Sequence, residues 1–306
     1  MDKQVFDVII VGAGTAGCLL ANRLSANKNL KIALIEAGGS DNYHWIHIPV
    51  GYLYCMGNKK TDWLLKTINQ RGLNGRSLNY PRGKVLGGCS SINGMIYMRG
   101  QSKDYDHWRQ LGNYGWGWDD VLPYFKKSED NFSGENNFHG VGGEWRVDKQ
   151  RLSWKVLDDF MEAAEQTGIP KIDDFNNGNN FGASYFKVNQ KNGFRLNTVK
   201  AFLNPIKHRK NLKIFTNCEV SNLIIEKNKV LGIRVFNKQK ETNIICNKEV
   251  VLSAGSIGTP KILELSGIGH PEVLNKYGIK VKIENKNVGE NLQDHLQLRV
   301  IYKLAN

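Results

Sequence analysis

Residues 6–36 read FDVIIVGAGTAGCLLANRLSANKNLKIALIE, and the order of patterns within them predicts a βαβ unit. The β-branched run 6–11 and the apolar run 31–36 are typical of buried parallel strands. Residues 18–27 between them predict a helix, because their leucines recur at helical spacing. The tight turn between the first strand and this helix carries GAGTAG, residues 12–17.

Each position of this turn has a physical role in binding a dinucleotide. Gly12 permits the turn, Gly14 lets a pyrophosphate approach the backbone, and Gly17 lets the helix pack closely on the strand. The start of the helix offers free amides and the positive end of its dipole to the phosphates. Glu36 follows Gly17 by 19 residues and is placed to accept hydrogen bonds from a ribose diol. We therefore favour a dinucleotide site over glycines that serve only a turn.

The composition excludes several other classes of function. The chain has 306 residues, 41% of them hydrophobic, and a formal net charge of +13. Its lysines are scattered and no nucleic-acid-binding motif accompanies them, so we expect no nucleic-acid partner. His44 and His47 stand three residues apart with no third ligand nearby, so we interpret them as part of a polar loop and expect no metal.

Cysteine usage and hydropathy indicate where the protein resides. The five cysteines are far apart and form no CxxC pair, which fits a reducing compartment. No apolar run approaches the ~20 residues of a membrane span, and the N-terminus lacks the layout of a signal peptide. We expect a cytoplasmic protein without a transmembrane segment, and we leave peripheral membrane association open.

Later segments add further elements and a second glycine-rich stretch. Residues 83–97, GKVLGGCSSINGMIY, contain too many glycines for a good helix and too many interruptions for a plain strand. Helices are predicted at 119–127 and 154–167. Short strands at 223–225, 230–236 and 243–245, separated by polar turns, predict an antiparallel meander.

The end of the chain repeats the pattern of a strand, a glycine and a helix. Residues 250–255 predict a further buried strand. A helix is expected to follow, with Thr259 as its N-cap, Pro260 at its first position and Gly267 ending it.

Three of these segments together resemble the glucose-methanol-choline (GMC) family of FAD-dependent oxidoreductases. They are GAGTAG with the EAG that begins at Glu36, GKVLGGCSSINGMIYMRG at 83–100, and AGSIGTPKILELSGIG at 254–269. GENLQDH at 289–295 matches as well. The resemblance covers essentially the whole chain. Within the family the chain is most similar to choline dehydrogenase and related bacterial alcohol dehydrogenases.

The resemblance implies an α/β fold. We expect a Rossmann-like FAD-binding domain of the GMC and glutathione-reductase type, with an antiparallel three-stranded meander and the beginning of a substrate-binding domain. Its implied divisions are FAD-binding segments at 1–150 and 196–300, a substrate or cap segment at 151–195, and the start of a truncated substrate domain at 301–306.

The resemblance also implies which residues hold FAD. The pyrophosphate would meet Thr15 and Ala16, the adenine would meet the backbone of Val220, and the flavin ring and ribityl chain would meet the segment around Val85 and the run 93–96. Ser90, Ser91 and Asn93 would satisfy polar groups there. The full implied set is Gly12, Gly14, Thr15, Ala16, Gly17, Glu36, Val85, Gly88, Asn93, Gly94, Met95, Ile96, Val220, Ala254 and Gly255.

Position 92 indicates how the flavin is attached. Some members of the family carry a histidine there that is bonded covalently to the flavin, whereas this chain has Ile92. We therefore expect FAD to be held without a covalent bond.

The reaction implied by the family is oxidation of a primary alcohol to an aldehyde, with hydride transfer to flavin N5. Oxygen or a quinone-type acceptor then reoxidises the flavin. The family's catalytic histidine belongs to a segment beyond both signatures, resembling HxxGTxxMG, and no such segment precedes Asn306. We expect no catalytic residue within this chain, and His295 belongs to the LQDH segment instead.

Because the segment resembling HxxGTxxMG is not found in this chain, three interpretations of its function are open. We favour the N-terminal part of a GMC alcohol dehydrogenase. A catalytically inactive stand-alone protein that binds FAD or a partner chain is the first alternative. A GMC flavoenzyme with other chemistry, such as fatty-acid photodecarboxylation, is the second.

Overall fold

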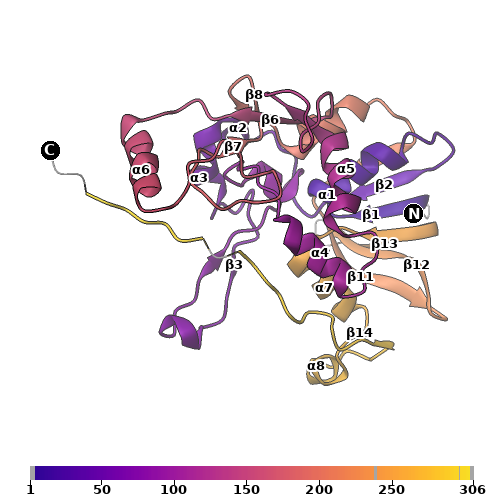
Figure 1. Cartoon of the computed structure of the whole chain (residues 1–306). Helices are drawn as coiled ribbons and strands as arrows, with labels where there is room; N and C mark the ends of the chain where they lie inside the picture. The colour runs from indigo at the N-terminus through magenta and orange to yellow at the C-terminus, as the bar shows by residue number, and fades with distance from the viewer. Residues whose placement is uncertain (1–3, 238–239, 296, 304–306) are drawn as a thin grey trace.

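The main sheet of the protein combines strands from both ends of the chain. The computed structural model describes residues 4–237, 240–295 and 297–303. The six strands are ordered β10-β2-β1-β13-β12-β11, and all neighbours are parallel except the pairs β13-β12 and β12-β11 (Figure 1). Their bounds are β1 (Gln4–Val11), β2 (Ile32–Ile35), β10 (Leu212–Phe215), β11 (Cys218–Glu226), β12 (Lys229–Asn237) and β13 (Lys240–Leu252).

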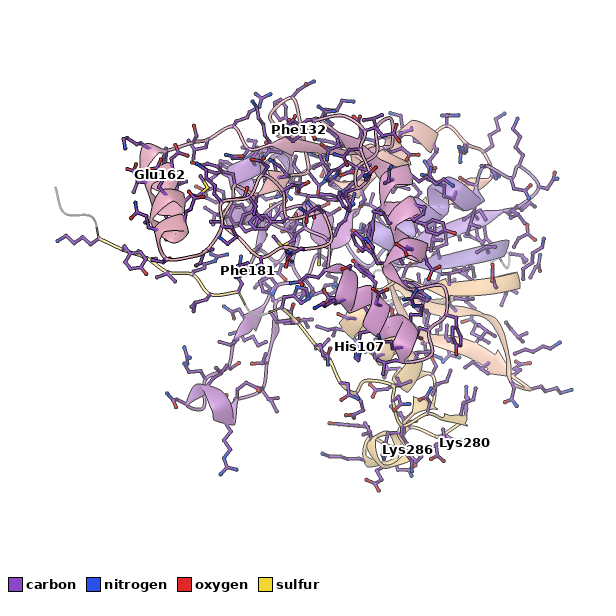
Figure 2. All side chains as sticks on the ribbon, in the orientation of Figure 1. His107, Phe132, Glu162, Phe181, Lys280 and Lys286 are labelled. Carbon is purple, nitrogen blue, oxygen red and sulfur yellow. The ribbon has the colours of Figure 1, made fainter. Side chains whose placement is uncertain are left out.

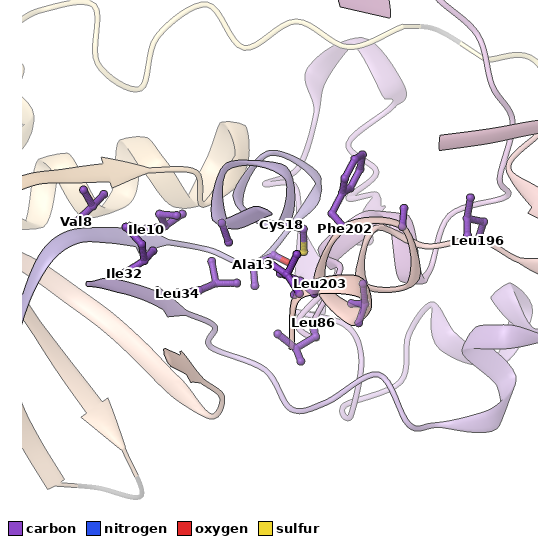
Figure 3. Packing of buried hydrophobic residues seen from close by; sticks show 14 residues of the cluster. Val8, Ile10, Ala13, Cys18, Ile32, Leu34, Leu86, Leu196, Phe202 and Leu203 are labelled. Atoms are coloured by element: carbon purple, nitrogen blue, oxygen red, sulfur yellow. The ribbon is translucent and has the colours of Figure 1, made fainter. Parts of the chain in front are cut away.

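Strand β1 is buried on both faces, as its apolar sequence predicts. Val8 and Ile10 face one layer, where helix α1 (Thr15–Leu24) and the π-helical turn η4 (Val199–Leu203) cover them (Figure 3). Ile9 and Val11 face the opposite layer, where they pack with apolar residues of β11 and β12. Successive residues of a strand point to opposite faces, so one short run supplies both cores.

The βαβ unit and the meander are confirmed, with one correction at strand β13. The expectation of separate strands at 243–245 and 250–255 is wrong, since β13 is one strand that ends at Leu252. Its first part pairs antiparallel with β12, from Lys240 to Ile245, and its later part pairs parallel with β1. The polar residues 247–248 in its middle lie where the pairing with β1 shifts register, between Phe6↔Cys246 and Val8↔Glu249, and the strand continues beyond them. The predicted turn between β12 and β13 includes residues 238–239, which lie outside the described residues.

Two helix boundaries also differ from the prediction. Helix α1 begins at Thr15, directly after Gly14 in extended conformation, rather than at Cys18. Helix α7 (Gly255–Leu265) begins at Gly255. The prediction that Thr259 and Pro260 begin it is wrong, because Gly255, with φ of +80°, turns the chain into the helix directly after β13.

Residues 267 and 259 show how this helix is bounded. Gly267 ends it as predicted, at φ of +87° directly after the C-cap. Thr259 contributes within the helix, where its hydroxyl accepts a hydrogen bond from the backbone N–H of Ala254 at 3.2 Å.

The remaining elements surround the main sheet. The helices predicted at 119–127 and 154–167 are confirmed as α5 (Trp118–Ser128) and α6 (Lys155–Gln166). In Figure 1 the hairpin formed by β3 (Leu65–Lys66) and β4 (Asn79–Tyr80) projects away from the body of the protein. The other elements are α2 (His44–His47), α3 (Tyr52–Cys55), α4 (Ser102–Gln110), α8 (Pro271–Lys276), η1 (Pro49–Gly51), η2 (Arg71–Leu73), η3 (Gly88–Ser91), η5 (Asn204–Ile206), β5 (Glu129–Asn131), β6 (Trp145–Lys149), β7 (Lys187–Val188), β8 (Gln190–Lys191), β9 (Phe194–Arg195), β14 (Ile268–Gly269) and β15 (Ile283–Glu284).

Charged side chains are spread over the molecule. Lys280 and Lys286 lie beside α8, whereas Glu162 lies on α6 at the opposite end of the view in Figure 2.

Among the described residues, no helix combines the length and the apolar character needed to cross a bilayer. The last three residues of the segment 301–306 lie outside the described residues. The division of the chain into FAD-binding and substrate segments stays a prediction.

A buried ionic cluster joins β5 to the loops around it. Arg99 donates a hydrogen bond to Glu129 at 2.8 Å, and both side chains are buried. The His139 ring lies between the carboxylates of Glu129, 3.0 Å from Nδ1, and Asp174, on the side of Nε2. Burial alone would lower the pKa of His139, but hydrogen bonds to the two carboxylates outweigh it and raise that pKa to about 9.

We predict that this cluster makes stability depend on pH above neutrality. The folded pKa of His139 exceeds its value of 6.5 in an unfolded chain, so its contribution is complete below pH 6.5 and is lost as pH rises through 9. The difference in free energy of unfolding between wild type and His139→Gln should fall by about 3 kcal/mol over that window. Urea titrations at several pH values measure it. His208→Gln, which removes an exposed histidine outside this cluster, is the control.

We also predict that the turn tolerates no side chain at Gly17. A Cβ there would lie 1.9 Å from the carbonyl oxygen of Gly12. Gly17→Ala should therefore cost about 3 kcal/mol or more of the free energy of unfolding. Gly72→Ala, where a Cβ meets nothing within 4 Å, should stay within about 0.5 kcal/mol of wild type. Equal losses in both variants, measured by denaturant unfolding, would contradict this account.

Candidate functional site: a cavity at the carboxyl ends of the parallel strands

A cavity of about 720 Å³ opens where three parallel strands end. Val11 of β1, Ile35 of β2 and Leu252 of β13 are the last residues of their strands, and all three line it. Ligands of open α/β sheets bind outside the carboxyl ends of the strands. The cavity therefore occupies the position that this fold provides for a ligand.

Nine of the fifteen residues predicted to hold the cofactor line this cavity, and the other six are outside its lining. Gly17 packs against Gly12, and the side chain of Val85 is buried in a small apolar cluster. Asn93, Gly94, Met95 and Ile96 are outside the cavity lining. The predicted residues in the lining are Gly12, Gly14, Thr15, Ala16, Glu36, Gly88, Val220, Ala254 and Gly255.

The cavity wall at the start of α1 is built from backbone of two glycine-rich segments. Gly14 is the N-cap of α1, no side chain caps this helix end, and its first turn contains no acidic residue. A Cβ on Gly88 would lie 2.8 Å from the Cα of Gly14, so the two glycine-rich segments touch without side chains between them. The amides at this helix start are thus left for an anionic group.

Arg82 supplies a cation at the same cavity. Its Nε is buried and has no hydrogen-bond partner among the described residues. A buried donor without a partner is costly, so this nitrogen is unusual among the side chains that line the cavity. The composition of the loop gave no signal that singled out this arginine.

Glu36 is held at the end of β2 by two backbone amides. Its carboxylate accepts hydrogen bonds from the N–H of Ala13 at 3.0 Å and of Gly38 at 2.8 Å. The side chain is only 5% exposed. Burial raises the pKa of Glu36 to about 7, although both amides act in the opposite direction. Its remaining lone pairs can accept hydrogen bonds from hydroxyl groups of a ligand.

An aromatic group with two lysines lies at the Val220 end of the cavity. The Nζ of Lys84 lies 4.2 Å from the centre of the Trp63 ring, and the Nζ of Lys261 lies 5.8 Å from it. The carboxylate of Glu219 lies 3.5 Å from Lys84 and 3.6 Å from Lys261. Trp63, Glu219 and Lys261 line the cavity, and their spacing in the sequence gave no sign of this arrangement.

The second glycine-rich segment places its serines inside the protein. The Ser90 hydroxyl donates to the carbonyl of Gly87 at 2.6 Å, and the Ser91 hydroxyl donates to the carbonyl of Leu86 at 2.7 Å. Both serines are buried. The expectation that they serve polar groups of a cofactor is therefore wrong, because their hydroxyls serve the protein's own backbone.

Ile92 and Gly94 of the same segment differ in their surroundings. The side chain of Ile92 is buried with Ile46, Cys55 and Val85. A Cβ on Gly94 would meet nothing within 4 Å, so no protein contact in the described structure requires glycine at that position. Gly83 and Gly88, by contrast, are required by contacts with protein backbone.

The histidines form no evident centre in the described structure. His44 and His47 both lie on α2, and no group of three or more His, Cys, Asp or Glu side chains among the residues described is placed to hold a metal. His295 is exposed in the segment that follows β15.

Comparison with known proteins gives the family. The profile of the GMC oxidoreductase family matches residues 6–297. The oxygen-dependent choline dehydrogenase of Photobacterium profundum is 41% identical over 98% of this chain and 53% of its own length. The alcohol dehydrogenase [acceptor] of Pseudomonas putida is 39% identical over 97% of this chain and 54% of its own length.

Solved structures agree with the sequence comparison. The crystal structure of pyridoxine 4-oxidase from Mesorbium loti superposes with a TM-score of 0.87 and 34% identity, covering 91% of this chain and 55% of the other. A formate oxidase superposes with a TM-score of 0.86 and 30% identity, covering 96% and 53%. This chain thus spans about half the length of the relatives it matches. It belongs to the GMC oxidoreductase family.

Proposed function

We propose that this chain binds FAD without a covalent bond, as the N-terminal part of a GMC dehydrogenase that oxidises a primary alcohol to an aldehyde. The observation that carries the proposal is the cavity at the strand ends. It combines an uncapped helix start, a glycine contact that excludes side chains and a buried carboxylate. Among related structures, one is described as an FAD-dependent oxidoreductase from Chaetomium thermophilum, 30% identical.

We assign the adenosine half of FAD to residues that line this cavity. The amides of Thr15 and Ala16 would hold the pyrophosphate, with the positive charge of Arg82 at the same cavity. Glu36 would accept hydrogen bonds from the adenosine ribose, and the backbone of Val220 would meet the adenine.

The flavin end would be held by the second glycine-rich segment and the start of α7. We assign the ring and ribityl chain to Gly88, to the run 93–96 and the backbone of Val85, and to Ala254 with Gly255. Gly94 fits this role, because the space next to it is not filled by described protein atoms.

The chemistry divides between the cofactor and the chain. FAD, when bound, supplies the hydride acceptor that an alcohol oxidation requires. The residues of this chain bind and orient it and exclude water from its adenosine half. Accepting the hydroxyl proton would require a base, which we assign to no residue of this chain.

Substrate, acceptor and location are narrower proposals. Choline and other primary alcohols are the substrates that the names of the relatives favour, and oxygen or a quinone-type molecule would accept the electrons. A cytoplasmic location is supported by the five free cysteines. We propose the same domain divisions as above, with FAD-binding segments at 1–150 and 196–300, a substrate or cap segment at 151–195 and the start of a substrate domain at 301–306.

The first prediction of this proposal concerns attachment. Purified chain saturated with FAD should release all of its yellow colour to the supernatant on acid precipitation, because position 92 offers an isoleucine in place of a nucleophile. Colour that stays with the pellet would overturn the non-covalent assignment.

A second expectation concerns the rate of flavin reduction. When choline or a simple primary alcohol is added under anaerobic conditions, the bound flavin should lose its colour about 10² to 10⁴ times more slowly than in a complete enzyme, because we assign no general base to this chain. Fast bleaching would refute that part of the proposal.

The second prediction concerns Glu36 and pH. Its folded pKa of about 7 exceeds the ordinary 4.5, so its contribution to the stability of the cofactor-free protein is complete below pH 4.5 and is lost as pH rises through 7. The free energy of unfolding of wild type minus that of Glu36→Gln should therefore fall across this window. Ribose hydroxyls bind the ionised form, so FAD affinity of wild type should rise from pH 6 to pH 8.

Two variants separate Glu36 from general effects of pH. Glu36→Gln should bind FAD weakly and without this pH dependence. Glu144→Gln changes a surface carboxylate that is paired with Arg23 away from the cavity, and it should bind FAD as wild type does. An FAD affinity that is independent of pH in wild type, measured by flavin fluorescence titration, would exclude a role for the Glu36 carboxylate.

A further inference from the structure

Two short polar sequences that lie far apart in the chain bind each other inside the protein. Residues 90–93 read SSIN and residues 195–198 read RLNT. The backbone N–H of Thr198 donates to the Ser90 hydroxyl at 3.1 Å, and the side-chain amide of Asn197 donates to the Ser91 hydroxyl at 2.9 Å. These four side chains are buried, so the contact is protected from water.

Arg195 is the anchor of this contact. Its side chain is 1% exposed, and no carboxylate among the described residues lies within 4 Å of it. Its guanidinium donates instead to three carbonyl oxygens, those of Ile46 at 2.7 Å, Ser90 at 3.1 Å and Asn93 at 2.6 Å. A fourth bond, at 2.8 Å, goes to Oδ1 of the Asn93 side chain. A buried charge that bonds only neutral groups is costly, so it is retained where it fixes a geometry.

The geometry that it fixes includes a strained residue. Met95 is a buried non-glycine residue with φ of +64°, in the left-handed region. The same Asn93 Oδ1 that binds Arg195 also accepts the backbone N–H of Met95 at 3.0 Å. On the other side, the carbonyl of Met95 accepts the N–H of Asn189 at 2.8 Å. Strained backbone conformations of this kind persist only where several surrounding hydrogen bonds impose them, and they are concentrated at ligand-binding sites.

We propose that Arg195 and Asn93 are positioning residues that hold Met95 in its left-handed conformation, and that this conformation presents the backbone of 94–96 to the flavin. The presentation of 94–96 rests on the proposed FAD site, whereas the hold on Met95 is a property of the chain alone. Arg195 acts through Asn93, and Asn93 acts through its bond to the Met95 amide.

The test uses glycine at position 95 as a selective rescue. Asn93→Ala removes the shared acceptor at an exposed residue, and Arg195→Lys removes the planar donor fork. Each should weaken FAD binding by on the order of tenfold and shift the visible flavin spectrum. Adding Met95→Gly to either variant should restore most of the affinity and the spectrum, because glycine adopts positive φ as readily as negative φ.

A matched glycine control separates positioning from general stabilisation. Lys227 also has a positive φ, of +46°, in the exposed turn between β11 and β12, so Lys227→Gly relieves strain away from the cavity. It should restore neither affinity nor spectrum in the Asn93→Ala background. Unchanged FAD binding in Asn93→Ala, or equal rescue by the two glycine substitutions, would overturn the proposal.

The hold on Met95 is tested without the cofactor by hydrogen exchange. Amides of residues 93–97 should exchange faster in cofactor-free Asn93→Ala than in wild type, while those of β1 should be unchanged. If wild type binds no FAD, the proposed function fails, and this exchange experiment still decides whether Asn93 holds the loop. Equal exchange in wild type and Asn93→Ala would contradict that hold.

Discussion

The backbones of the two glycine-rich segments lie directly against each other, and the position of the cavity depends on this contact. The N–H of Gly87 donates to the carbonyl of Ala13 at 2.8 Å. A Cβ on Gly88 would lie 2.8 Å from Gly14, and a Cβ on Gly38 would lie 2.0 Å from the carbonyl of Lys84. The turn at 12–17 and the glycine-rich loop at 83–97 can approach each other this closely only where side chains are absent. The glycines at these contacts are therefore required by the protein itself, whereas no described protein contact requires glycine at position 94.

Local sequence was sufficient for the parts of the fold that depend on short-range patterns. The βαβ unit, the meander and helices α5 and α6 follow from the period of apolar residues and from turn chemistry. The errors arose where a tertiary contact overrides the local pattern. Strand β13 continues through polar residues because β12 and β1 supply its hydrogen bonds in turn, and α7 starts at Gly255 because the chain must turn there.

The site shows the same division between what is local and what is not. The turn at 12–17 and Glu36 belong to one continuous unit, so their spacing alone predicted a shared cavity. The two serines of the second segment were assigned wrongly, because their hydroxyls donate to the nearby carbonyls of Gly87 and Leu86 and accept from Thr198 and Asn197, more than 100 residues away. Arg195 gave no signal for the same reason. A buried polar residue can be interpreted only when its partners are known, because polarity in a sequence usually indicates exposure.

The order of strands imposes a further constraint on how the cavity forms. Strand β1 has β2 on one side and β13 on the other, and β10 completes the far edge beside β2. The strand ends that line the cavity thus come from the first 35 residues and from Leu252. Until β13 is in place, one edge of β1 is unpaired and the cavity lacks a wall. Such long-range pairing carries a large loop-closure entropy that must be offset before the contacts form. A ligand that binds only the completed cavity would stabilise this late contact by mass action, so cofactor binding and closure of the sheet are thermodynamically linked.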